Sequence, residues 1–213
     1  TVFKETMQHL PNDKATCTGS IIRQQLFEGD KERGLKLCGF EGNKKVLLVM
    51  GGSLGSVILN DALRENLKQL LPMFNIVHLC GKGNLDESLI HVEGYRQFEY
   101  VTDELSDILF LANFVVSRAG SNSIFEFLAL HKPMLLIPLS AAKSRGDQIL
   151  NANLFKKQGF AHVLEEEALT KDSFMVSIEA LIKSEEQIID KMLDAERPKT
   201  PKEMVNLILQ YEK

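Results

Sequence analysis

Phe114-Val115-Val116-Ser117-Arg118-Ala119-Gly120-Ser121-Asn122-Ser123-Ile124-Phe125-Glu126 is the stretch that decides the fold of this chain. Its apolar, β-branched start predicts a buried strand. The strand ends at a short glycine turn, and Ser121 or Ser123 is placed to cap the helix that follows. A strand that enters a helix through such a turn directs free backbone N–H groups and the positive helix end toward one point. That point suits an anion or a polar ligand.

Glu126 lies one turn into this predicted helix, and two interpretations of its role are open. Ser123-x-x-Glu126 fits a capping box, in which the two side chains only close the helix end. In the other interpretation the carboxylate accepts hydrogen bonds from a ligand. The stretch alone favours the cap, so the choice depends on the rest of the chain.

A second strand, glycine loop and helix precede this stretch. The apolar run Val46–Met50 predicts a strand buried on both faces of a parallel sheet, and Gly51-Gly52-Ser53-Leu54-Gly55 follows it directly. This geometry holds phosphate groups, although a simple tight turn is the alternative. The spacing is neither a dinucleotide fingerprint nor a Walker loop. The next predicted strand, Ile76–Cys80, ends without the acidic residue that holds an NAD ribose, which disfavours a dinucleotide enzyme.

The remaining strands and helices alternate along the chain. Further strands are predicted at 97–101, 134–139 and 161–164, with helices at 104–112, from 147 and from 170. Asp103 is placed to cap the first of these helices. Asp147, Gln148 and Asn151 share one face of the second, which is either a binding face or a solvated one. The alternation predicts a doubly wound parallel sheet of the Rossmann-like α/β class.

Three polar segments follow strands in this arrangement: the Gly51–Gly55 loop, the Ser117–Glu126 turn and the Ser140–Asn151 loop. The carboxyl ends of parallel strands lie along one edge of a sheet, where ligands bind. Their convergence predicts a nucleotide or nucleotide-sugar site and favours the ligand role of Glu126. Arg23 is either a phosphate ligand or a solvated surface residue.

Composition limits the partners. The chain has 213 residues, is 44% hydrophobic and carries a net charge of -4, so we expect a globular domain without nucleic acid as a partner. No apolar run has membrane-spanning length. Cys17, Cys38 and Cys80 form no C-x-x-C pair, which predicts reduced thiols of a cytoplasmic protein and no zinc site.

These motifs closely resemble those of the MurG family, bacterial transferases that add N-acetylglucosamine from UDP-N-acetylglucosamine to the lipid-linked acceptor lipid I. The resemblance spans nearly the whole chain and follows the family's order. Its motifs are Gly51–Gly55 with Leu59-Asn60, Ser117–Gly120 with Ser123 and Glu126, and Asp147-Gln148 with Asn151-Ala152. It covers only the donor-binding half of a two-domain glycosyltransferase B fold.

The resemblance implies a role for each matching residue. Gly52, Ser53 and Gly55 would face the diphosphate, Glu126 the ribose hydroxyls, and the backbone at Val101 and Thr102 the uracil. Gly120, Ser121, Asn122 and Ser123 would lie near the phosphate and sugar, and Asp147, Gln148 and Asn151 would hold the sugar hydroxyls. Arg23 matches the arginine after the family's Thr-Gly-Asn-Pro-x-Arg segment, although Ile21 replaces its proline. Ser56 and Ser121 replace the family's usual alanines.

The resemblance also implies a domain organisation. Residues 1–213 would form one donor-binding domain, with 1–22 as an interdomain connection and 199–213 as a terminal helix. The acceptor domain, with the residues that activate the acceptor, would be absent, and no catalytic residue is assigned. The full-length protein would act in peptidoglycan synthesis at the cytoplasmic face of the cell membrane, as a peripheral protein.

The expected chemistry needs neither metal nor cofactor. A helix N-terminus and Ser53 can stabilise the leaving diphosphate, and the chain contains no D-x-D sequence. We therefore expect a domain that binds UDP-N-acetylglucosamine but transfers poorly alone. Two alternatives stay open: a subunit of a split transferase that acts with a separate membrane partner, and a non-catalytic UDP-sugar binding module.

Overall fold

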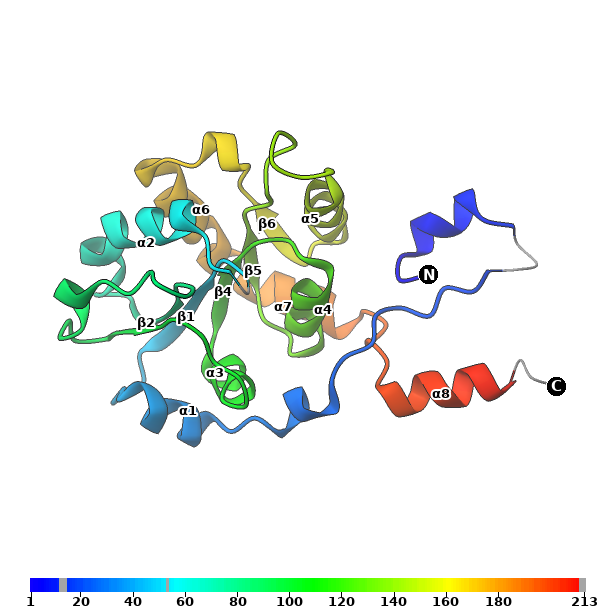
Figure 1. Cartoon of the computed structure of the whole chain (residues 1–213), viewed down its shortest axis with the longest axis horizontal. Helices are drawn as coiled ribbons and strands as arrows, with labels where there is room; N and C mark the ends of the chain where they lie inside the picture. Colours follow the sequence, from blue (N-terminus) through cyan, green and yellow to red (C-terminus); the bar gives the residue numbers. More distant parts are fainter. Residues whose placement is uncertain (12–14, 53, 211–213) are drawn as a thin grey trace.

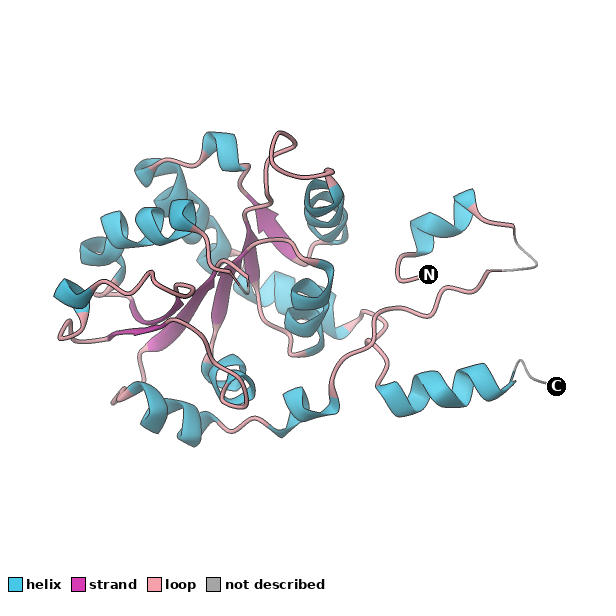
Figure 2. Cartoon of the chain, in the orientation of Figure 1, coloured by secondary structure: helices cyan, strands magenta, loops and turns pink. Residues whose placement is uncertain are grey.

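The structure, a computed structural model, describes residues 1–11, 15–52 and 54–210. Within these residues the centre is a six-stranded, all-parallel sheet in the order β3-β2-β1-β4-β5-β6 (Figure 2). The strands are β1 (Lys45–Met50), β2 (Phe74–Leu79), β3 (Tyr95–Phe98), β4 (Phe114–Ser117), β5 (Met134–Leu136) and β6 (Ala161–Val163). The strand order reverses between β1 and β4, so the predicted doubly wound parallel sheet is confirmed.

Helices cover both faces of this sheet. α2 and α6 lie on one side, and α3 and α4 lie on the other (Figure 1). The α-helices are α1 (Lys31–Cys38), α2 (Val57–Leu70), α3 (Leu105–Leu111), α4 (Ser121–Ala129), α5 (Asp147–Gln158), α6 (Lys171–Lys183), α7 (Glu185–Leu193) and α8 (Pro201–Gln210). Short 3-10 helices are η1 (Lys4–His9), η2 (Gln24–Glu28), η3 (Glu87–Leu89) and η4 (Glu166–Ala168).

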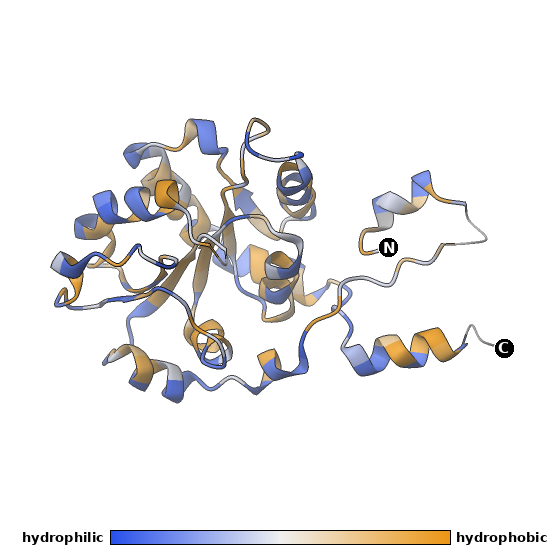
Figure 3. Ribbon diagram, in the orientation of Figure 1, coloured by the Kyte–Doolittle hydropathy of each residue, from blue (hydrophilic) through white to orange (hydrophobic). Residues whose placement is uncertain are grey.

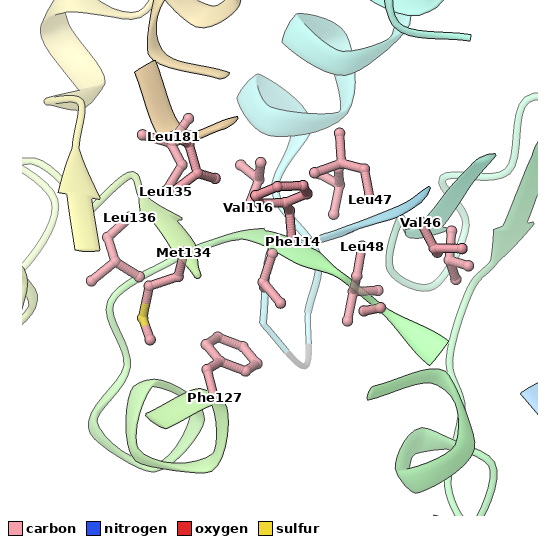
Figure 4. Close-up of a cluster of buried hydrophobic side chains, with 14 of the residues drawn as sticks. Val46, Leu47, Leu48, Phe114, Val116, Phe127, Met134, Leu135, Leu136 and Leu181 are labelled. Atoms are coloured by element: carbon pink, nitrogen blue, oxygen red, sulfur yellow. The ribbon is translucent and has the colours of Figure 1, made fainter. Parts of the chain in front are cut away.

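The core lies on both faces of β1, β4 and β5, because these strands are covered by helices on each side. Leu47 and Phe114 are register partners, and Leu135 on the same face points toward Leu181 of α6 (Figure 4). On the opposite face Met134 points toward Phe127 of α4 (Figure 4). All of these side chains are almost fully buried. The continuous apolar runs of these strands are the pattern expected of a sheet that is buried on both faces.

Two strands differ most from the bounds that the sequence predicts. The expected strand 97–101 is found at Tyr95–Phe98, because its neighbour β2 ends at Leu79, the register partner of Phe98. The expected strand 134–139 ends at Leu136. Beyond that point Pro138 has no N–H for a ladder, and the carbonyls of Ile137 and Pro138 accept hydrogen bonds from Arg118.

The helix starts also differ from prediction. α4 begins at Ser121 with Gly120 as its N-cap, and no described side chain caps it, so the predicted Ser121 or Ser123 cap is wrong. α3 begins at Leu105 with Glu104 rather than Asp103 at the cap position. Asp103 instead accepts a hydrogen bond from the Ser106 hydroxyl through its backbone carbonyl.

The two terminal segments lie side by side where they leave the sheet domain (Figure 1). Ile21 and Lys199 form a parallel bridge, and Ile22 is buried in the core. Beyond this crossing α8 projects from the domain, and its exposed apolar residues Val205, Ile208 and Leu209 form a stripe (Figure 3). The predicted terminal helix is thus present over Pro201–Gln210, and residues 211–213 lie outside the described ranges.

Among the residues described, no helix has both the length and the apolar composition that a membrane crossing needs.

Candidate functional site

A pocket of about 840 Å³ opens at the carboxyl edge of the sheet. Met50 and Gly52 reach it from the end of β1, and Leu79 reaches it from the end of β2. The segment after β3 and the start of α4 form further walls, and residues of the η2 region close another side. The pocket therefore lies at the point where the strand order reverses, between β1 and β4, which is where open parallel sheets bind ligands.

The structure brings half of the predicted site residues together in this pocket. The lining contains Arg23, Gly52, Val101, Thr102, Asn122, Ser123 and Glu126. The described residues that were predicted but do not line it are Gly55, Gly120, Ser121, Asp147, Gln148 and Asn151. Ser53 lies outside the described residues. The residues assigned to uracil and ribose thus share one pocket with Asn122 and Ser123, whereas the three assigned to the sugar hydroxyls, Asp147, Gln148 and Asn151, do not line it. Their binding roles stay predictions.

Glu126 forms an ion pair with Arg23, and not the capping box that the sequence allows. Arg23 Nη2 donates to Glu126 Oε1 at 3.1 Å, although the two residues are 103 positions apart. The Glu126 side chain is 12% exposed, whereas that of Arg23 is 60% exposed. Burial raises the pKa of Glu126, and the positive charge of Arg23 acts in the opposite direction. The pocket therefore presents a poorly solvated carboxylate that gains from additional hydrogen-bond donors.

Three glycines follow β1, and their surroundings fall into two kinds. A Cβ on Gly55 would lie 2.3 Å from the Cys80 carbonyl oxygen, and one on Gly51 would lie 2.4 Å from the Ser56 nitrogen. Gly55 also has a φ of +76°, in the left-handed region. Gly52, at +89°, has nothing within 4 Å of its Cβ position and lines the pocket. Gly51 and Gly55 therefore serve close backbone packing, while Gly52 leaves open space beside the pocket.

The N-terminus of α2 follows this glycine segment, and Ser56 occupies its cap position. The Ser56 hydroxyl makes no cap hydrogen bond to the described residues; it accepts one from Arg118 Nη2 at 2.8 Å. The N–H groups of the first turn of α2 therefore do not donate to that hydroxyl. Together with the helix dipole they form a region of positive potential next to Gly52.

The first turn of α5 is fixed to two loops by its amide side chains. Gln148 Oε1 accepts a hydrogen bond from the Leu139 N–H at 3.1 Å. Asn151 is buried, and its Nδ2 donates to the Ala119 carbonyl at 3.0 Å. Each amide has one polar atom in a backbone contact, so these residues position the loops after β4 and β5 in addition to any contact with a ligand. Asp147 is exposed at the same helix end.

Sequence reasoning missed two features of the site. Tyr100 lines the pocket with 65% of its surface exposed, and it was hidden by the prediction that a strand continues to Val101. An exposed aromatic residue in a pocket offers a flat surface on which a ring can stack. Arg118 is buried and contacts three separate segments. No local sequence pattern predicts these contacts. The position of Arg118 directly after a buried strand was the available signal.

A doubly wound parallel sheet with its pocket at the strand-order reversal defines the class of α/β domains that bind nucleotide-type ligands at that edge. The comparison with known proteins is more specific. The sequence model of the Glycosyltransferase family 28 C-terminal domain matches residues 46–207. The chain belongs to this family.

Curated relatives agree with this assignment. The chain is 57% identical over 185 residues to the UDP-N-acetylglucosamine–N-acetylmuramyl-(pentapeptide) pyrophosphoryl-undecaprenol N-acetylglucosamine transferase of Geobacillus thermodenitrificans, covering 87% of this chain and 52% of that protein. It is 49% identical over 209 residues to the protein of the same name from Clostridium tetani, covering 98% of this chain and 58% of that protein. The chain thus spans little more than half the length of these relatives.

Solved structures share the fold. MurG of Acinetobacter baumannii has a TM-score of 0.68 and 20% identity, covering 94% of this chain and 58% of that one. The calicheamicin glycosyltransferase CalG4 has a TM-score of 0.62 and 14% identity, covering 92% of this chain and 46% of that one. The predicted half of a glycosyltransferase B fold is confirmed by these similarities.

Proposed function

We propose that this chain is the donor-binding half of an N-acetylglucosaminyltransferase. It binds UDP-N-acetylglucosamine, and the complete enzyme transfers the sugar to lipid I in peptidoglycan synthesis at the inner face of the membrane. The observation that carries the proposal is the pocket at the strand-order reversal, with the buried Glu126 carboxylate in its wall. The choice of donor and acceptor is supported by the names of relatives that are 57% and 49% identical to the chain over the matched residues.

In this proposal the uridine occupies the 840 Å³ pocket. Its base lies against the segment after β3, near Tyr100 and Val101. The ribose hydroxyls donate to Glu126, whose buried carboxylate then gains the donors that its surroundings lack. Arg23 is in contact with Glu126 and close enough to the pocket to turn its exposed guanidinium toward a diphosphate.

The diphosphate faces Gly52 and the N-terminus of α2, where N–H groups and the helix dipole favour negative charge. This arrangement stabilises the UDP leaving group as the sugar bond breaks, and we propose that it does so without a metal ion. The described residues include no group that we assign as the base for the acceptor hydroxyl. The chain alone is therefore expected to bind the donor without transferring the sugar.

Calorimetry on the chain tests the ligand and Glu126 together. UDP and UDP-N-acetylglucosamine should bind, and ATP should bind much more weakly. Glu126→Gln should weaken UDP by about ten- to a hundredfold, because a charge-assisted hydrogen bond contributes about 1.5–3 kcal/mol. Glu28→Gln is the matched control, since Glu28 also lines the pocket but is exposed. Equal binding of ATP, or equal losses in the two variants, would contradict the uridine and ribose assignments.

A split transferase subunit is the second candidate. The apolar stripe of Val205, Ile208 and Leu209 on α8 favours it, because such a face indicates contact with further protein. Both candidates predict donor binding by the chain, but they differ in where the acceptor half comes from. A transfer assay with a lipid I analogue decides between them. Addition of a relative's N-terminal half restores transfer in the first case, and only a separate membrane partner does so in the second.

A further inference from the structure

Four charged or hydroxyl side chains from four separate segments meet beside the proposed donor site. Ser56, Arg118, Lys143 and Glu166 are called here the Arg118 cluster. Arg118 and Glu166 are its buried centre, with side chains 8% and 4% exposed, whereas the Lys143 side chain is 54% exposed. Buried ions are costly unless they are paired, so this cluster constrains the segments that carry it.

Arg118 makes contacts in three directions. Its Nη1 donates to the carbonyls of Ile137 and Pro138 after β5, at 3.1 and 3.3 Å. Its Nη2 donates to the Ser56 hydroxyl at 2.8 Å and pairs with Glu166. A planar guanidinium has its donors in fixed directions, so it holds its acceptors in a fixed relative geometry that a flexible ammonium does not impose.

Glu166 extends this connection to the loop after β5. Its Oε1 accepts from Lys143 Nζ at 2.7 Å, while its Oε2 pairs with Arg118. Burial opposes ionisation of this carboxyl, but the hydrogen bonds from Lys143 and Arg118 hold its pKa below the usual range. Lys143 belongs to the loop Ser140–Gly146, which leads directly into α5 and Gln148. The chain of contacts therefore runs from the start of α2 to the start of α5.

These two helix starts are the ends of the proposed donor site. The start of α2 is the proposed diphosphate side, and the start of α5 carries the residues predicted to contact the sugar. We propose that Arg118 is a positioning residue that couples these two sides, with Glu166 and Lys143 holding the loop Ser140–Gly146 in its binding position. The identity of the ligand rests on the proposed function. The coupling between the two helix starts is inferred from the contacts alone and does not need a bound ligand.

A ligand-free experiment tests the coupling first. Trypsin cleavage after Arg145 reports opening of the loop. Ser56→Ala removes only a hydroxyl at the far end of the cluster, and it should accelerate that cleavage by about three- to tenfold, since Arg118 loses one of its anchors. An unchanged cleavage rate in Ser56→Ala would overturn the proposal, whether or not the chain binds a UDP-sugar.

A double-mutant cycle then measures the coupling in donor binding. Ser56→Ala and Lys143→Met should each weaken UDP-N-acetylglucosamine by about three- to tenfold, and the double variant should lose less than the product of the two. Lys143→Met should spare UDP, because UDP lacks the sugar, and Lys143→Arg should restore donor affinity. Arg145→Met is the matched control for the lost positive charge, since it forms no ion pair among the described residues.

The outcomes separate the two proposals. A chain that binds neither UDP nor the donor overturns the proposed function, while faster cleavage in Ser56→Ala still supports the coupling. Strictly multiplicative losses in the double variant, with Lys143→Arg no better than Lys143→Met, overturn the coupling even when the donor binds. Equal losses of UDP and the donor in Lys143→Met also overturn it, because a purely structural defect affects both ligands.

Discussion

Glu126 shows how one residue takes a role that its local sequence does not determine. Its spacing from Ser123 fits a helix cap, yet its carboxylate pairs with Arg23, which is 103 positions earlier in the chain. An ion pair between distant segments depends on how the chain brings them together, and local spacing carries no information about it. In the described part of the chain the helix α4 has no side-chain cap, so the capping box is absent, and the carboxylate stays available to a ligand that displaces Arg23.

His78 is a second residue whose surroundings set its chemistry. It is fully buried in β2, with Nδ1 2.7 Å from the Tyr95 hydroxyl and Nε2 2.9 Å from Asn60 Oδ1. Because the Asn60 amide donates to the Cys80 carbonyl, its oxygen faces His78 and accepts from Nε2–H. The Tyr95 hydroxyl then donates to Nδ1. A neutral imidazole satisfies both contacts, whereas a second proton on Nδ1 would force the Tyr95 hydroxyl to turn from donor to acceptor.

We predict that His78 makes the domain sensitive to mild acid. Burial, assisted by the nearby Arg64, lowers the pKa of His78 from 6.5 to about 3. Below pH 6.5 His78 therefore binds a proton in the unfolded chain but not in the native chain. As a result, the free energy of unfolding falls as the pH falls from 6.5 toward 3. The loss between pH 7 and pH 5 should be about 2 kcal/mol in the free energy of unfolding.

Urea unfolding at both pH values measures this loss. His78→Gln should lower stability at pH 7 but reduce its change between the two pH values. The exposed His91 is the control position, and His91→Gln should keep the full dependence of the parent chain. Identical pH dependence in the parent chain and His78→Gln would show that other groups are responsible.

At the scale of the element, α5 combines a predicted binding face with observed structural anchors. The sequence places Gln148 and Asn151 on one face, and the structure shows that their surroundings differ. Gln148 is half-buried and bonded to the Leu139 N–H, whereas Asn151 is buried and bonded to the Ala119 carbonyl. The Ala119 carbonyl belongs to the turn between β4 and α4. Asn151 therefore ties α5 to the turn on which the proposed site depends.

Single alanine variants should separate these two residues. Gln148→Ala should weaken UDP-N-acetylglucosamine by about tenfold and leave UDP binding nearly unchanged, since only the sugar would lose a contact. Asn151→Ala should weaken both ligands and lower the melting temperature, because a buried carbonyl that loses its partner costs about 1–3 kcal/mol. Calorimetry and thermal melts provide both measurements. If the two variants behave alike, the division between sugar contact and anchor is wrong.

At the scale of the whole molecule, α8 stands apart from the domain that binds the proposed donor. None of its described side chains is buried, while its apolar residues Val205, Ile208 and Leu209 are each more than half exposed. The chain leaves the domain after the bridge between Ile21 and Lys199, so α8 contributes little to the core. Its apolar stripe is therefore exposed and free of core contacts, which is the feature that favours the split-transferase candidate.

Removal of residues 201–213 should therefore leave the domain intact. We expect the melting temperature to stay within about 2 °C and UDP affinity to be unchanged, because surface changes alter stability by about 0.5 kcal/mol or less. A chain that ends at Ser184 is the control, since it also loses α7 with its buried Ile188 and Met192. That chain should melt far lower. Similar destabilisation by both truncations would show that α8 belongs to the folded core.

Local pattern was sufficient to predict that strands alternate with helices and that the strands are parallel, although it did not place every strand end and helix cap. Val46–Val49 and Phe114–Val116 are continuous apolar runs, and such runs are stable only when both faces of a strand are covered. The glycine turns after them placed the site at the carboxyl edge of the sheet. The sequence by itself therefore determined the fold class, the edge that holds the pocket and the candidate role of Glu126.

Only the tertiary structure decided which polar side chains share a contact. The Arg23–Glu126 pair, the Arg118–Glu166 pair and the tie from Asn151 to Ala119 all join segments far apart in the chain. The packing of the sheet also determines that β3 ends at Phe98, the register partner of the last residue of β2. Tyr100 therefore lies outside the strand and lines the pocket. Periodicity records which face of an element is buried. Which polar groups meet depends on where the other elements end, and that is settled when the sheet and its loops pack together.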